Sequence, residues 1–200
     1  NSLKITNRQN KAVCDVPLLP ETSDFQQITI WEDEVEGQRV SDTVDAWFTE
    51  QLGITCSLFY QPDTAVRPID ADYAITGTEH TSFSDGYPIL LVSQESLDDL
   101  NSKATQRMEM QRFRPNIVIS GATPFQEDSL QEIRVGSAVL YGVKPCARCV
   151  LTTIHPETAQ KGAEPLQTLA TYRKKGNKVL FGQNVVVHQI GKIKVGDELS

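Results

Sequence analysis

The stretch KPCARCVLTT (residues 144–153) places two of the chain's four cysteines, Cys146 and Cys149, beside two cations, Lys144 and Arg148. It follows an apolar segment. A thiolate is the form of cysteine that binds metals and attacks electrophiles, and nearby positive charge favours that form. The stretch therefore predicts a reactive or metal-bound cysteine.

Short β-strands are expected on both sides of this stretch. Apolar residues at 133–135 and 138–140 flank Gly136, as in two strands joined by a turn. The other expected strands are residues 25–40, 54–60, 88–92, 117–119, 150–154, 179–181, 185–187 and 193–197. Many short strands with turn signals and few helices predict a mixed β-rich α+β fold with a β-barrel and short helices.

Three helices are expected between these strands. Ser41 offers an N-cap to a helix whose apolar residues recur at helical spacing until Gly53, and Ser93 caps a second one. Residues 165–172 form the third. The polar segment 61–86, interrupted by proline and glycine, predicts a long loop.

Composition narrows the class of protein. The net charge of -7 argues against a general nucleic-acid binder, and no apolar run approaches the ~18 residues that would span a membrane. Cys14 and Cys56 lack the regular framework of a secreted disulfide-rich domain, so a reducing, cytoplasmic setting is expected. The three histidines are widely scattered, which disfavours a four-ligand zinc site at Cys146 and Cys149.

Several motifs occur in a fixed order along the chain. They are SDGYP (84–88), FRPNIVISG (113–121), CARCVLTT (146–153), EPLQTL (164–169), FGQN (181–184) and IKVGD (193–197). This succession resembles the MOSC domain of molybdenum-cofactor sulfurase C-terminal-like proteins, in the YcbX branch related to the mitochondrial amidoxime-reducing component. The resemblance implies a MOSC domain at residues 83–200 and part of a β-rich N-terminal domain at 1–60, joined by a connecting loop at 61–82.

The resemblance implies a molybdenum–molybdopterin cofactor whose one protein ligand is Cys149, the second cysteine of the motif. Thiolate ligation suits a soft metal that changes oxidation state. Cys146 is then a neighbouring residue, or a small buried hydrophobe.

Six further residues follow from the same resemblance. Arg114 is expected to bind the cofactor's phosphate or pterin, since a planar guanidinium pairs with an oxyanion through two hydrogen bonds. Asn116 and Asp85 are expected to bind the pterin, although each is also a plausible turn residue. Arg148 is expected to offset thiolate and phosphate charge, or else to face solvent. Tyr87 and Asn184 complete the expected cofactor-binding set, and the mitochondrial relatives carry tyrosine at the position of Asn184.

The implied activity is two-electron removal of oxygen from N-hydroxylated compounds, such as N-hydroxylated bases and amidoximes. Electrons are expected from a flavin reductase or another donor acting through an iron–sulfur domain. That [2Fe-2S] domain would follow residue 200, so the chain is interpreted as a central fragment, inactive alone. Two alternatives stay open: a sulfur- or cofactor-carrier module with a Cys149 persulfide, and a β-barrel with purely structural cysteines.

Overall fold

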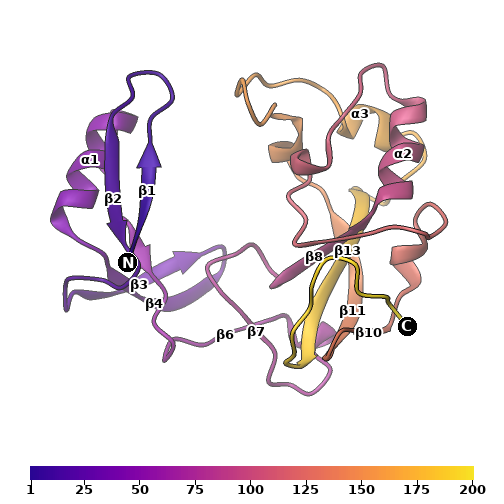
Figure 1. The fold of residues 1–200 in the computed structure, drawn as a ribbon, viewed down its shortest axis with the longest axis horizontal. Helices are drawn as coiled ribbons and strands as arrows, with labels where there is room; N and C mark the ends of the chain where they lie inside the picture. The colour runs from indigo at the N-terminus through magenta and orange to yellow at the C-terminus, as the bar shows by residue number, and fades with distance from the viewer. The chain divides into compact units, whose positions relative to one another are not determined.

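The computed structural model describes all residues, 1–200, as two compact units, Asn1–Arg67 and Pro68–Ser200 (Figure 1). The boundary lies inside the segment 61–82 that the sequence assigns to a connection. No helix in either unit has the length and apolar character needed to span a bilayer.

Unit 1 (residues 1–67) is built from two antiparallel hairpins and a helix. Its elements are β1 (Ser2–Thr6), β2 (Val13–Pro17), β3 (Phe25–Ile30), β4 (Asp33–Arg39), α1 (Asp42–Leu52), β5 (Phe59–Tyr60) and, at its end, β6 (Arg67–Pro68). β1 pairs with β2, and β3, β4 and β5 form a three-stranded sheet. The core lies between α1 and the β1–β2 hairpin, around Cys14, Val16, Val40 and Val44. The sequence did not predict the β1–β2 hairpin.

The ends of α1 are set by the two residues that the sequence predicted. The Ser41 side chain accepts a hydrogen bond from the Val44 amide, and Gly53 adopts φ 68°, where its N–H reaches the Thr49 carbonyl. Glycine enters this left-handed region at little cost. Only Phe59–Tyr60 of the expected 54–60 strand pairs with β4, because the Cys56 amide and carbonyl both bind the Thr49 hydroxyl instead.

Unit 2 (residues 68–200) is organised around a curled half-barrel sheet. Its strand order is β10 (Glu132–Val135), β11 (Ala138–Ala147), β13 (Lys178–Gln189), β8 (Ile89–Ser93) and β9 (Ile117–Ile119). The β8–β9 pair is parallel and the other neighbours are antiparallel. The remaining elements are η1 (Ala71–Tyr73), β7 (His80–Thr81), α2 (Gln94–Lys103), η2 (Met110–Arg112), η3 (Gln126–Ser129), η4 (Val150–Thr153), α3 (Leu166–Leu169) and β12 (Lys174–Lys175), where η marks a 3₁₀ helix. The expected β-rich fold with short helices is confirmed.

Each face of this sheet carries its own core. On the face that α2 and α3 cover, Phe113 and Phe181 are fully buried and stack with ring centroids 4.2 Å apart. On the opposite face Leu91, Ile133 and Val185 form a second cluster. Adjacent residues of β8 therefore serve different cores, as the alternation of side chains along a strand requires.

Four of the predicted strands differ in the structure. Residues 150–153 form η4 rather than a strand, because the hydroxyls of Thr152 and Thr153 bind carbonyls three residues earlier. Residues 193–197 form no strand, since Asp197 closes a local turn with Lys194. Residues 179–181 and 185–187 belong to one continuous strand, β13, which passes through Gly182 at φ 78°.

Other predicted segments differ only in extent. The third helix is limited to Leu166–Leu169, and the 61–86 segment is a loop interrupted by the short elements β6, η1 and β7. The two strands around Gly136 are present as β10 and β11, and β11 extends to Ala147. The first cysteine of the pair therefore lies at the end of a sheet strand, and the second lies beyond it.

Candidate functional site

Cys146 and Cys149 occupy different structural positions. Cys146 is half-buried near the end of β11, whereas Cys149 is exposed at the residue that starts η4. The Cys149 carbonyl accepts hydrogen bonds from the Thr152 amide and, at 2.9 Å, from the Thr152 hydroxyl. The backbone at Cys149 is therefore fixed while its thiol faces outward.

Arg148 connects the cysteine stretch to the segment that carries Arg114. Its Nη1 lies 3.1 Å from the Cys146 sulfur, and its Nη2 donates to the Phe113 carbonyl at 2.8 Å. Its backbone amide donates to the Val179 carbonyl at 2.8 Å. Its Nε is buried without a hydrogen-bond partner. The expected solvent-facing alternative for Arg148 is therefore wrong, since its guanidinium lies among these groups.

The surroundings of Cys146 raise the pKa of its thiol. Burial raises the pKa of the Cys146 thiol, and the charge and hydrogen bond of Arg148 offset only part of this rise. The negative charge of Asp85 raises the pKa further, which places the Asp85 loop near Cys146. Cys146 therefore suits a packing role, as the sequence indicated, and the exposed Cys149 is the thiol that can bind an outside group.

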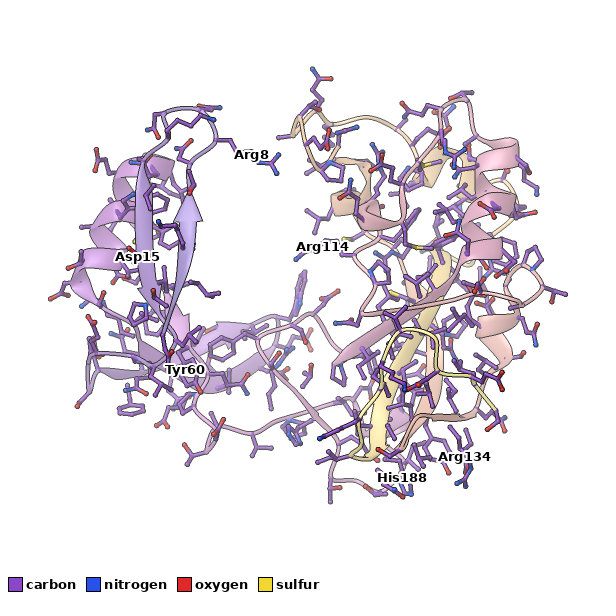
Figure 2. The ribbon with its side chains drawn as sticks, in the orientation of Figure 1. Arg8, Asp15, Tyr60, Arg114, Arg134 and His188 are labelled. Carbon is purple, nitrogen blue, oxygen red and sulfur yellow. The ribbon has the colours of Figure 1, made fainter.

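Arg114 and Asn116 follow the buried Phe113. Arg114 has φ 54° and is exposed, and Figure 2 shows its side chain extending outward from the second unit. Asn116 is bound to β8 by two hydrogen bonds of 2.9 Å: its amide donates to the Leu90 carbonyl, and its Oδ1 accepts from the Leu90 amide. These bonds therefore join Asn116 to β8, 26 residues earlier in the chain, rather than to its own loop.

Asn184 lies in the same row of the sheet as these groups. In the register of β13, Asn184 pairs with Leu90 of β8 on one side and with Lys144 of β11 on the other. Paired residues in antiparallel strands direct their side chains to the same face. The structure therefore places Asn116, Asn184 and Lys144 in one row across neighbouring strands of the sheet.

Asp85 and Tyr87 lie in the loop that enters β8. Asp85 is exposed. The Tyr87 hydroxyl is buried without a hydrogen-bond partner, and burial strongly raises the pKa of Tyr87. The Tyr87 ring lies 4.7 Å from Lys144 Nζ and packs edge-on against Tyr73.

Sequence reasoning missed Tyr73 and the contact that Lys144 makes with it. The sequence indicated Lys144 only as a positive charge near the cysteines, and Tyr73 lies in a segment that was expected to be a loop. The aromatic spacing of Tyr73 and Tyr87, on either side of a short strand, was the one available signal.

The residues fit an anionic group that carries a soft metal. The residues expected at the site include an exposed thiol at Cys149, an exposed guanidinium at Arg114, and two buried groups that lack hydrogen-bond partners, Arg148 Nε and the Tyr87 hydroxyl. A thiolate is a ligand for soft metals, and guanidinium groups pair with phosphate. The donor set is therefore compatible with a molybdenum–molybdopterin cofactor.

Comparisons with known proteins place the chain in a family. "Mitochondrial amidoxime-reducing component 1" of Homo sapiens is 36% identical over 176 residues, which is 82% of this chain and 52% of that protein. "Mitochondrial amidoxime reducing component 2" of Rattus norvegicus is 33% identical over 193 residues, covering 90% of this chain and 57% of that protein. "Molybdenum cofactor sulfurase" of Oryza sativa subsp. japonica is 33% identical over 174 residues, covering 78% of this chain and 21% of that protein.

The chain spans about half the length of the two amidoxime-reducing components. A solved structure, YiiM from Geobacillus stearothermophilus, is less similar, with 18% identity and a TM-score of 0.42 over 56% of this chain and 53% of that one. The family model of the MOSC domain matches residues 78–200, which include Cys149, Arg114 and the whole half-barrel sheet. The chain therefore belongs to the MOSC domain family, as its motifs predicted.

Proposed function

We propose that this chain holds the molybdenum cofactor of an oxidoreductase that reduces N-hydroxylated compounds. The observation that carries the proposal is the exposed Cys149 thiol, on a stretch that Arg148 ties to the segment presenting Arg114. Two relatives, at 33% and 36% identity, are named as amidoxime-reducing components, which supports amidoximes as substrates, and N-hydroxylated bases are proposed as substrates of the same chemical class.

Each residue would contribute a separate binding or positioning role. Cys149 would ligate molybdenum as a thiolate, and Arg114 would pair with the cofactor's phosphate. Asn116, Asn184, Asp85 and Tyr87 would contact the pterin. When bound, the cofactor supplies the two-electron chemistry that removes oxygen from an N-hydroxyl group.

Arg148 would act by positioning rather than by ligation. Its guanidinium binds the Cys146 sulfur and the Phe113 carbonyl, so it fixes the spacing between the cysteine stretch and Arg114. Burial raises the pKa of the Cys146 thiol, whereas Cys149 is exposed and accessible to a bound group, so Cys149 is the thiol assigned as ligand.

Electron delivery and cell location are part of the proposal. We propose that electrons reach the site from a flavin reductase or another donor through a [2Fe-2S] domain, and that the protein works in the cytoplasm. A small N-hydroxylated molecule would be its substrate, with no role for nucleic acid or membrane binding.

Metal analysis of the full-length protein tests the proposal. We expect close to one molybdenum atom per chain in wild type and in the control Cys56→Ser, and less than a tenth of that in Cys149→Ala. With dithionite-reduced methyl viologen as the electron source, benzamidoxime reduction should follow the molybdenum content. Full molybdenum retention and activity in Cys149→Ala would refute the role of this thiol.

The alternative role is transfer of sulfur or cofactor through a persulfide on Cys149. Two observations support this alternative: the thiol of Cys149 is exposed, and the chain is similar to a protein named molybdenum cofactor sulfurase. Intact-mass measurement distinguishes the two roles: a gain of about 32 Da on Cys149, the mass of one sulfur atom, without stoichiometric molybdenum supports the carrier.

A further inference from the structure

Lys144 is enclosed by two aromatic rings. Its Nζ lies 3.8 Å from the ring centroid of Tyr73 and 4.7 Å from that of Tyr87. The two rings pack edge-to-face with centroids 6.3 Å apart. The Lys144 side chain is 29% exposed, so its ammonium is partly removed from water.

The rings of Tyr73 and Tyr87 and the Asp70 carboxylate offset the free-energy cost of burying this ammonium. Burial lowers the pKa of Lys144, and the charge of Asp70 acts in the opposite direction. The Asp70 oxygen is 3.9 Å from Nζ, which is long for a direct ion pair, and the Asp70 side chain is half exposed. The faces of aromatic rings attract a cation, and more strongly as water is excluded. The Tyr73 ring and the Asp70 oxygen are therefore about equally near to this ammonium, and the Tyr87 ring completes its surroundings.

The lysine and the tyrosines belong to different parts of unit 2. Lys144 is in β11, whereas Tyr73 and Tyr87 lie at the two ends of the segment 70–88 that precedes β8. Backbone hydrogen bonds near Tyr73 are local, such as that from its amide to the Asp70 carbonyl. Residues 141–143, just before Lys144 in β11, and residues 72–75 line an open depression of about 320 Å³. The contact at Lys144 therefore lies beside this depression.

The same segment carries Asp85 toward the cysteine strand. The charge of Asp85 acts on the Cys146 thiol, and the charge of Cys146 acts on the ammonium of Lys144, two residues before it. Asp85 immediately precedes Gly86 and Tyr87, so the position of the Tyr87 ring limits where Asp85 can lie.

We propose that Lys144 is a positioning residue, whose ammonium clamps the Tyr73–Tyr87 pair and so holds the loop bearing Asp85 against the cysteine strand. The consequence for cofactor retention rests on the function proposed above. The clamp itself does not, because it is made by residues of this chain alone.

Amide hydrogen exchange on cofactor-free protein tests the clamp directly. We compare wild type with Lys144→Met, Lys144→Arg and a matched control, Lys174→Met, whose lysine is exposed in β12. Two cation–ring contacts predict about tenfold faster exchange across residues 70–88 in Lys144→Met. Lys144→Arg should stay within about twofold of wild type because guanidinium also binds ring faces, and Lys174→Met should match wild type.

A second variant covers the case in which Lys144→Met does not fold. Tyr73→Leu keeps an apolar side chain but removes one ring face, so it should also speed exchange in residues 70–88. Unchanged exchange in Lys144→Met, or in Tyr73→Leu if that is the variant that folds, would overturn the clamp. Exchange that is faster by the same factor in Lys144→Arg and Lys144→Met would also overturn the clamp.

Molybdenum content of the full-length variants supplies the second readout. We expect Lys144→Met to retain several-fold less molybdenum than wild type, and Lys144→Arg to retain most of it. Faster exchange with undiminished molybdenum would overturn the positioning role. Absence of molybdenum from wild type would instead refute the proposed function, and the exchange measurement would still decide whether the clamp exists.

Discussion

Replacement of Arg148 by methionine tests how the site is held together. Methionine keeps an unbranched apolar stem but removes the guanidinium, and with it the bonds to the Cys146 sulfur (3.1 Å) and the Phe113 carbonyl (2.8 Å). The weaker contact of the guanidinium with the Phe113 ring, at 5.8 Å, is lost as well. The change should therefore destabilise unit 2 and release the segment that presents Arg114.

The expected magnitude follows from these contacts. A hydrogen bond from a charged donor contributes about 1.5–3 kcal/mol, and its loss leaves the Phe113 carbonyl without its donor. The bond to sulfur and the distant ring contact add little. Removal of the buried, unpartnered Nε returns part of the loss. We expect the free energy of unfolding of unit 2 to fall by about 2 kcal/mol.

The chain offers separate spectroscopic signals for the two units. Both tryptophans, Trp31 and Trp47, lie in unit 1, whereas four of the five tyrosines lie in unit 2. Urea unfolding followed by second-derivative tyrosine absorbance should show the loss, while tryptophan fluorescence reports on unit 1. Arg107→Met is the matched control, since Arg107 is exposed. If Arg148→Met and Arg107→Met shift the tyrosine transition equally, the reasoning is refuted.

Two further substitutions, one in each unit, test how that unit is stabilised. Gly182→Ala should destabilise unit 2 by about 2 kcal/mol, because φ is 78° and the new Cβ would lie 2.9 Å from the Leu91 carbonyl oxygen. Chemical denaturation measures this loss of stability. A loss below about 0.5 kcal/mol would contradict the prediction. Burial alone would raise the pKa of the Asp45 carboxyl, but hydrogen bonds from the Leu58 amide and Arg39 outweigh it and lower the pKa. The stability that Asp45 contributes is therefore present at neutral pH and lost as the pH falls from about 5 toward 2. Asp45→Asn should lower the stability of unit 1 at pH 7 and flatten its acid dependence, and an unchanged pH profile of tryptophan fluorescence unfolding would disprove this.

Features fixed by neighbouring residues were predictable from the sequence. Ser41 and Gly53 bound α1 because a side-chain acceptor and a left-handed glycine act within one helical turn. Ser93 likewise starts α2 by accepting from the Ser96 amide. The MOSC family was predictable for a different reason, since an ordered set of short motifs is read directly from the chain and matches the family model over residues 78–200.

Features that depend on competition or on distant contacts were not predictable. Residues 150–153 have β-like composition, and hydroxyl bonds from Thr152 and Thr153 to nearby carbonyls still favour a 3₁₀ turn. The enclosure of Lys144 depends on Tyr73, which lies 71 positions earlier in a segment without regular spacing. The sequence pattern gives no information on this contact, because the contact depends on how the loop packs on β11.

The hydrogen bonds between Asn116 and Leu90 fix the orientation of a side chain that a ligand could meet. The Leu90 amide is a donor and requires an acceptor, so the Asn116 Oδ1 is held toward β8. The Nδ2 group can then only donate, while Oδ1 keeps one lone pair as an acceptor. A molecule bound at Asn116 would therefore meet a donor and an acceptor in fixed places, and its carbonyl or ring nitrogen would have to lie on the Nδ2 side.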